Sequence, residues 1–93
     1  MVHDEVGRSF KSPIIPQILL ILYKNPGIHV RKLIEERGGS STSTSQLIKY
    51  LVELGMIKIE KEKDIPRRYH LYLTEKGNKI AELLERIDKI LGE

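Results

Sequence analysis

The stretch Ser40–Ile57, SSTSTSQLIKYLVELGMI, decides how the rest of the chain is interpreted, because it predicts a helix that begins among hydroxyl residues and ends at Gly55. At about 100° per residue, one side of this helix collects Thr44, Leu47, Ile48, Leu51 and Leu54. The opposite side collects Thr42, Ser45, Gln46, Lys49 and Glu53. Residues 40–52 carry a single charged side chain, a lysine, in a chain that is 31% charged. The outer face therefore differs from the Glu- and Lys-rich face of an ordinary solvated helix.

Short polar side chains near a helix N-terminus suit the major groove of DNA, where they bond to base edges. Ser41 or Thr42 is expected to cap the helix and to offer a hydroxyl or a backbone N–H to a phosphate. Gln46 can bond adenine through two atoms, and Lys49 can reach guanine or a phosphate. The candidate DNA contacts of this helix are Ser41, Thr42, Ser43, Ser45, Gln46, Lys49 and Tyr50. Two alternatives stay open: the hydroxyl residues serve only as caps, and Tyr50 only packs against a neighbouring helix.

The composition fits one small domain, since the chain has 93 residues of which 40% are hydrophobic. There is no cysteine, so disulfides and thiolate metal sites are excluded and the cytoplasm is the expected compartment. No apolar run reaches the length of a membrane span. The formal net charge is +3, although residues 74–93 carry four Lys or Arg against five Asp or Glu. The basic excess therefore lies outside the C-terminal segment.

Turn signals divide the chain into a clear order of elements. Residues 1–12 are predicted as a flexible N-terminal arm, and a first helix from about residue 16 ends at Asn25-Pro26-Gly27. A very short strand at 28–29, a helix closed by Gly38-Gly39 and the helix described above follow. Alternating apolar residues then predict strands near 57–61 and 69–73, joined by a charged loop. Thr74 is expected to cap a final helix over about residues 75–91.

This order predicts an α+β, mainly helical fold for residues 13–93. The type is a winged helix-turn-helix, with a three-helix core, a two-stranded wing and a C-terminal helix. Arg31 and Lys32 begin the second helix, which crosses the DNA backbone in helix-turn-helix docking, so either residue is a candidate phosphate contact. The wing cations expected along the minor groove or its phosphates are Lys61, Lys63, Arg67 and Arg68. Acidic residues lie among them, which leaves open that the hairpin is merely solvated.

The final helix carries an apolar stripe that its own small domain cannot cover over its full length. Residues 75–91 extend about 25 Å at about 1.5 Å per residue, beyond the reach of a three-helix core. The first half of the stripe is expected to pack on that core. Pairing with a second copy would remove the distal half from water. The residues expected to build a homodimer are Ile80, Leu83, Leu84, Ile87, Ile90 and Leu91.

Nothing in the sequence indicates catalysis, a cofactor or a metal site. His3, His29 and His70 lack the spacing of metal ligands. The pair Gly38-Gly39 precedes serines but lacks the Gly-Lys-Ser/Thr ending of a phosphate-binding loop. No nucleophile motif or apolar pair of carboxylates is present. We therefore expect no enzyme activity, no cofactor and no bound metal.

Four segments together resemble the winged-helix transcription regulators, above all MarR-like and PadR-like proteins and small archaeal or archaeal-virus relatives. The segments are Leu33–Gly38, Thr42–Ser45, Leu51–Ile57 and Leu71–Gly77. The resemblance covers roughly residues 16–91. Its most specific motif is the Leu-Thr-Glu-Lys-Gly ending of the second wing strand, whereas Leu-x-x-Leu-Gly-x-Ile is common to nearly all such domains. The resemblance implies double-stranded DNA binding, usually as a homodimer on a palindromic operator.

The expected function is that of a homodimeric, sequence-specific, double-stranded-DNA-binding transcriptional regulator. Two alternatives remain at this point. One is a chromatin-type protein with weak sequence preference, and the other is a winged-helix adaptor that binds proteins. The outer face of the Ser40–Ile57 helix favours DNA, because an adaptor would more often expose Leu, Phe or Trp there.

Overall fold

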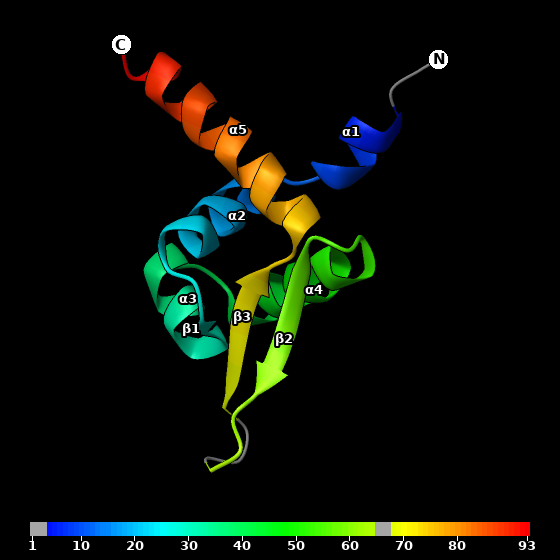
Figure 1. The fold of residues 1–93 in the computed structure, drawn as a ribbon, viewed down its shortest axis with the longest axis vertical. Helices are drawn as coiled ribbons and strands as arrows, with labels where there is room; N and C mark the ends of the chain where they lie inside the picture. Colours follow the sequence, from blue (N-terminus) through cyan, green and yellow to red (C-terminus); the bar gives the residue numbers. More distant parts are fainter. Residues whose placement is uncertain (1–3, 65–67) are drawn as a thin grey trace.

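The structure is a computed structural model and describes residues 4–64 and 68–93. In chain order the elements are α1 (Asp4–Ser9), α2 (Ile14–Lys24), β1 (Ile28–His29), α3 (Val30–Arg37), α4 (Ser41–Glu53), β2 (Ile57–Lys61), β3 (Tyr69–Leu73) and α5 (Glu75–Leu91). The three strands form one antiparallel sheet in the order β1-β3-β2. This is the winged helix-turn-helix fold that the order of elements predicted, with both wing strands at the predicted positions (Figure 1).

Helix α2 is the centre of the core. It buries Ile15, Ile18, Leu19 and Leu22, which form one core cluster with buried residues from β1 through α5. The helix begins two residues before Pro16, where the sequence placed its start. The reason is that proline is tolerated in the first helical turn, where its missing N–H has no intrahelical partner. Asn25 ends the helix and donates its side-chain amide to the Ile21 carbonyl at 2.9 Å.

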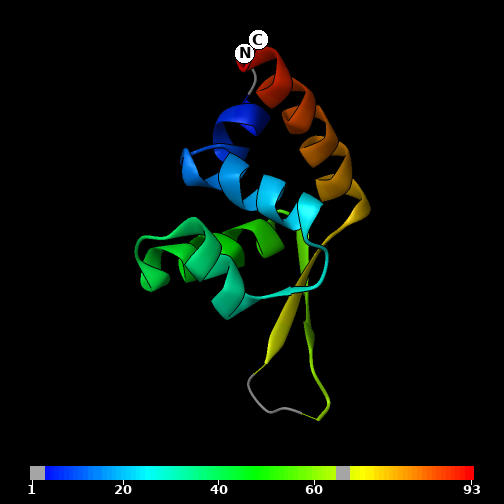
Figure 2. The same ribbon diagram turned by 90° about the vertical axis from the view of Figure 1, so that its left-hand side faces the viewer.

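The hairpin β2–β3 passes from the core into solvent along one strand face. Ile57 and Leu71 on that face are buried, whereas Ile59 and Tyr69, one step nearer the tip, are exposed. Successive side chains on one strand face are two residues apart, so this is the point where the core ends and the wing begins. The wing and the distal end of α5 project from opposite ends of the molecule, which measures 45 × 32 × 26 Å (Figure 2).

The N-terminal segment differs from the expected loose arm, because residues 4–9 form α1. Two contacts with α4 hold α1 and the residues that follow it. The Tyr50 hydroxyl donates to the Arg8 carbonyl at 2.5 Å, and Lys11 Nζ lies 3.6 Å from the centre of the Tyr50 ring. Phe10 packs against the core. These are long-range contacts, which no periodicity in a twelve-residue polar segment can indicate.

Candidate nucleic-acid interface

Helix α4 starts one residue earlier in the hydroxyl run than expected, because Ser40 is its N-cap. Ser40 Oγ accepts from the Ser43 backbone N–H at 3.3 Å. Thr44 is fully buried, donates to the Ser40 carbonyl at 2.9 Å and accepts from Arg37 Nε at 3.0 Å. The capping role given to Ser41 or Thr42 was therefore wrong. Both lie exposed in the first turn, where hydroxyls and backbone N–H groups can face an anion.

The two faces of α4 divide as the sequence predicted. Thr44, Ile48 and Leu51 are buried, and Leu47 and Leu54 pack partly against the core. On the other face Ser43 is exposed and Ser45 is half-buried, and the long polar side chains, Gln46 and Lys49, are exposed. The exposed face thus combines hydroxyl, amide and ammonium groups, which suits contact with base edges and phosphates.

Tyr50 belongs to the packing of the N-terminal segment. Its hydroxyl donates a hydrogen bond to the Arg8 carbonyl, and the Lys11 ammonium lies over its ring, as described above. Both polar features of the side chain are engaged within the chain. The structure thus favours the packing role over the DNA contact.

The wing brings cations and acids together. Lys61 and Lys63 are exposed, and Arg67 lies outside the described residues. Glu62 donates its backbone N–H to the Arg68 carbonyl at 2.9 Å, so the two residues face each other across the hairpin. Glu62 Oε2 lies 3.8 Å from Arg68 Nε. Hairpin pairing thus brings to Arg68 one of the acids that the sequence places among the wing cations.

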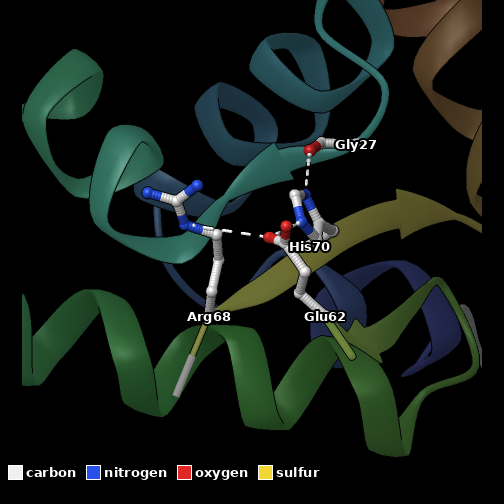
Figure 3. A network of polar contacts seen from close by, with 4 residues as sticks. All are labelled: Gly27, Glu62, Arg68 and His70. Carbon is white, nitrogen blue, oxygen red and sulfur yellow. Dashed lines mark hydrogen bonds and ion pairs between the residues drawn. The ribbon is translucent and has the colours of Figure 1, made fainter. Parts of the chain in front are cut away.

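His70 joins the wing to the turn after α2 (Figure 3). One ring nitrogen, Nδ1, lies 2.8 Å from the Gly27 carbonyl, and the other, Nε2, lies 2.9 Å from Glu62 Oε2. The backbone bond to Gly27 and then the side-chain bond to Glu62 raise the pKa of His70 above its usual 6.5. Both neighbours are acceptors, so each favours the protonated ring. The sequence showed no signal for this network, because Gly27 lies 43 positions from His70 and the contact of Glu62 with His70 depends on hairpin pairing.

Arg31 and Lys32 lie exposed at the start of α3, on the side that faces the wing. They line an open hollow of about 620 Å³ together with His29 and Arg68. Glu35 and Glu36 line the same hollow, and Lys32 Nζ lies 3.6 Å from Glu36. The fold thus brings cations from α3 and the wing to one surface.

The apolar stripe of α5 divides into two parts. Ile80 and Leu84 pack against the core, which confirms the expectation for the first half of the helix. Leu83, Ile87, Ile90 and Leu91 are more than half exposed. In the described part of the chain, no helix is long and apolar enough to cross a membrane. Residues 4–64 and 68–93 also contain no group of acids and histidines arranged to hold a metal ion.

Known proteins share this architecture. A family model described as "MarR family" matches residues 16–64. A MarR-family transcriptional regulator of Listeria monocytogenes, solved with a 26-mer DNA, is 29% identical with a TM-score of 0.74 over 77% of this chain and 48% of that one. A MarR transcriptional regulator of Methanosarcina mazei Go1 is 28% identical with a TM-score of 0.76 over 84% and 56%. This chain thus spans about half the length of these two relatives.

A protein of Archaeoglobus fulgidus has the same fold at a more similar length. It is 23% identical with a TM-score of 0.74, and the match covers 84% of this chain and 87% of that chain. Among curated protein sequences, none matches this chain significantly.

Proposed function

The chain belongs to the MarR family, and from that premise we propose that it is a cytoplasmic transcriptional regulator that binds a specific double-stranded DNA sequence as a homodimer. The observation that carries the proposal is the exposed face of α4, where Gln46 and Lys49 lie beside the hydroxyl-rich first turn. A helix with this face can enter a major groove while the wing follows the neighbouring backbone.

Each group of residues has a distinct role in this proposal. Gln46 and Lys49 read base edges, and the first turn of α4, Ser41 to Ser43 with Ser45 behind it, holds phosphates. The wing cations Lys61, Lys63, Arg67 and Arg68 bind phosphates or the minor groove. Arg31 and Lys32 bind backbone phosphates on the surface that they share with Arg68. The 26-mer DNA bound to the Listeria relative supports this use of the fold.

The homodimer is proposed from the distal half of α5. Ile87, Ile90 and Leu91 are 51%, 63% and 79% exposed, and they follow one another along a single helix face. Large apolar side chains gathered in this way mark an association surface. Leu83, which is 56% exposed, extends the same surface toward the core. A second copy related by a twofold axis would cover these residues with the same residues of its own α5.

The test is a titration of the purified chain against labelled fragments of genomic DNA at a low and a moderate salt concentration. We expect one class of fragments to be bound about a thousandfold more tightly than random DNA, with affinity falling as salt rises. Equal affinity for all fragments would support a chromatin-type protein instead. No binding at low salt would refute the proposed function and favour a protein-binding adaptor.

A further inference from the structure

The ring of His70 faces a hydrogen-bond acceptor at each nitrogen. The Gly27 carbonyl lies 2.8 Å from Nδ1 and the Glu62 carboxylate lies 2.9 Å from Nε2. A neutral imidazole has one N–H, so in that form one of the two nitrogens would point a lone pair at an oxygen. Only the imidazolium, with two N–H groups, donates to both neighbours. The two distances therefore favour the protonated ring.

The carboxylate held by His70 is also the acid nearest to Arg68. The same oxygen, Glu62 Oε2, lies 2.9 Å from His70 and 3.8 Å from Arg68 Nε. The first distance is a hydrogen bond and the second is a loose ion pair. The terminal nitrogens of Arg68 point away from the carboxylate (Figure 3). Arg68 also lines the surface hollow that it shares with Arg31 and Lys32.

We propose that His70 is a positioning residue of the DNA interface, which as an imidazolium holds Glu62 and so leaves the Arg68 guanidinium free to bind a DNA phosphate. This inference rests on the proposed function. When His70 loses its proton, Glu62 loses either the hydrogen bond from the ring or the positive charge opposite it. The Glu62 carboxylate then turns to the Arg68 guanidinium. A fork of two N–H···O bonds then competes with the phosphate for the same donors. DNA binding is therefore linked to protonation of His70, which does not itself contact the DNA.

The other charges around His70 leave this assignment unchanged. His29 on β1 packs edge-on against the ring with 5.1 Å between centres. Glu60 is opposite His70 in the β2–β3 register, and its carboxylate lies 3.9 Å from Lys58. The positive charge of Arg68 disfavours protonation of His70. The hydrogen bonds to Gly27 and Glu62 are the larger effects, so the pKa of His70 is raised. Affinity should therefore be highest below about pH 6.5 and fall as pH rises through the folded-state pKa.

The experiment measures the affinity of the full chain for its best DNA fragment between about pH 5.5 and about pH 8.5. We expect a loss of about three- to fivefold across this range, the effect of one exposed charge contact. Glu62→Gln should bind tightly at both ends of the range, because no carboxylate competes for Arg68. Arg68→Gln should bind weakly at both ends. Lys79→Gln, which removes an exposed charge from α5, is the control and should keep the pH dependence.

A double-mutant cycle separates positioning from simple charge. His70→Gln should weaken binding at low pH in the natural chain and have no effect in the Glu62→Gln background. Equal losses in both backgrounds would show that His70 acts only as a nearby positive charge and would overturn the proposal. NMR spectra of each variant verify folding, and the imidazole resonances should report a lower pKa for His70 in Glu62→Gln. An unchanged pKa or a pH-independent wild type would also overturn it. Absence of DNA binding at every pH would instead refute the proposed function, and this inference with it.

Discussion

Gln46 and Lys49 are about one helical turn apart on the exposed face of α4, where neither contributes to the core. Side chains in such positions cost the fold little when they are changed, so their effect on DNA binding can be measured cleanly. Glu62 is the opposite case at the same scale. It contacts both His70 and Arg68, so replacing it removes a charge from both contacts at once.

Replacing Gln46 with alanine should remove a base contact. We expect a loss of about 1–3 kcal/mol on the best DNA site and a much smaller loss on random DNA, because a bidentate amide contact discriminates between bases. Fluorescence anisotropy with the two DNAs measures both values. Gln17→Ala, the same change at an exposed position of α2, should leave both affinities unaltered. Equal losses on the two DNAs would show that this face of α4 does not read bases.

Replacing Arg67 and Arg68 together with glutamine should weaken binding to all sequences. Each lost phosphate contact should flatten the dependence of log affinity on log salt by about 0.9. Binding isotherms at four salt concentrations give the slope. Lys79→Gln removes an exposed cation from α5, away from the wing, and should leave the slope as it is. A slope unchanged by the double substitution would place the wing in solvent.

At the scale of elements, the junction between the wing and α5 depends on one close backbone approach. A Cβ built on Gly77 would lie only 2.1 Å from the carbonyl oxygen of Met56. Thr74 secures the same junction, since its hydroxyl donates to the Gly55 carbonyl at 2.6 Å and accepts from the Gly77 N–H at 3.1 Å. The final glycine of the Leu-Thr-Glu-Lys-Gly motif is therefore required by packing between α5 and the residue before β2.

Gly77→Ala should lower the free energy of unfolding by at least about 2 kcal/mol, because the methyl group forces α5 away from Met56. Urea unfolding followed by circular dichroism measures the change. Gly7→Ala is the matched control, since a Cβ there meets nothing within 4 Å and the residue also lies inside a helix. It should be neutral or slightly stabilising. Equal stability of Gly77→Ala and the wild type would contradict the close approach.

At the scale of the whole molecule, the proposed DNA surface and the exposed stripe lie at opposite ends. The wing projects at one end and the distal half of α5 at the other (Figures 1 and 2). A twofold axis at the α5 end can therefore join two copies without covering either wing. Two α4 helices held in this way would require half-sites about 10 base pairs apart, or a multiple of that spacing.

Replacing Ile87 and Leu91 with lysine should give a folded monomer that binds its operator much more weakly. The substitutions place like charges in the proposed contact, and the second half-site then no longer adds its contacts. Sedimentation equilibrium at tens of micromolar measures the mass. Asn78→Lys with Glu82→Gln adds the same charge to α5 at exposed positions outside the stripe and should remain dimeric. A monomeric wild type, or a dimeric Ile87→Lys, Leu91→Lys variant, would refute this interface.

Local patterns within single segments were enough to predict most of the fold. The apolar periodicity of residues 44–54, the alternation in the two wing strands and the Thr74 cap all depend on neighbours a few residues away. The same periodicity separated the buried from the exposed face of α4, and so named Gln46 and Lys49 as candidates. The start of α2 and the cap of α4 were misplaced by one or two residues, because proline and serine are each tolerated at several positions of a first turn.

The sequence by itself determined the order of elements from α2 to α5, the exposed polar face of α4 and the apolar character of α5, because these follow from spacing along one helix or strand. The tertiary structure alone decided which charges meet. It placed Glu62 against His70 and Arg68, bonded His70 to Gly27 across the sheet, and used Tyr50 to hold the N-terminal segment. Such contacts depend on hairpin register and on helix packing between residues up to 43 positions apart. The spacing of residues within one segment therefore cannot predict them.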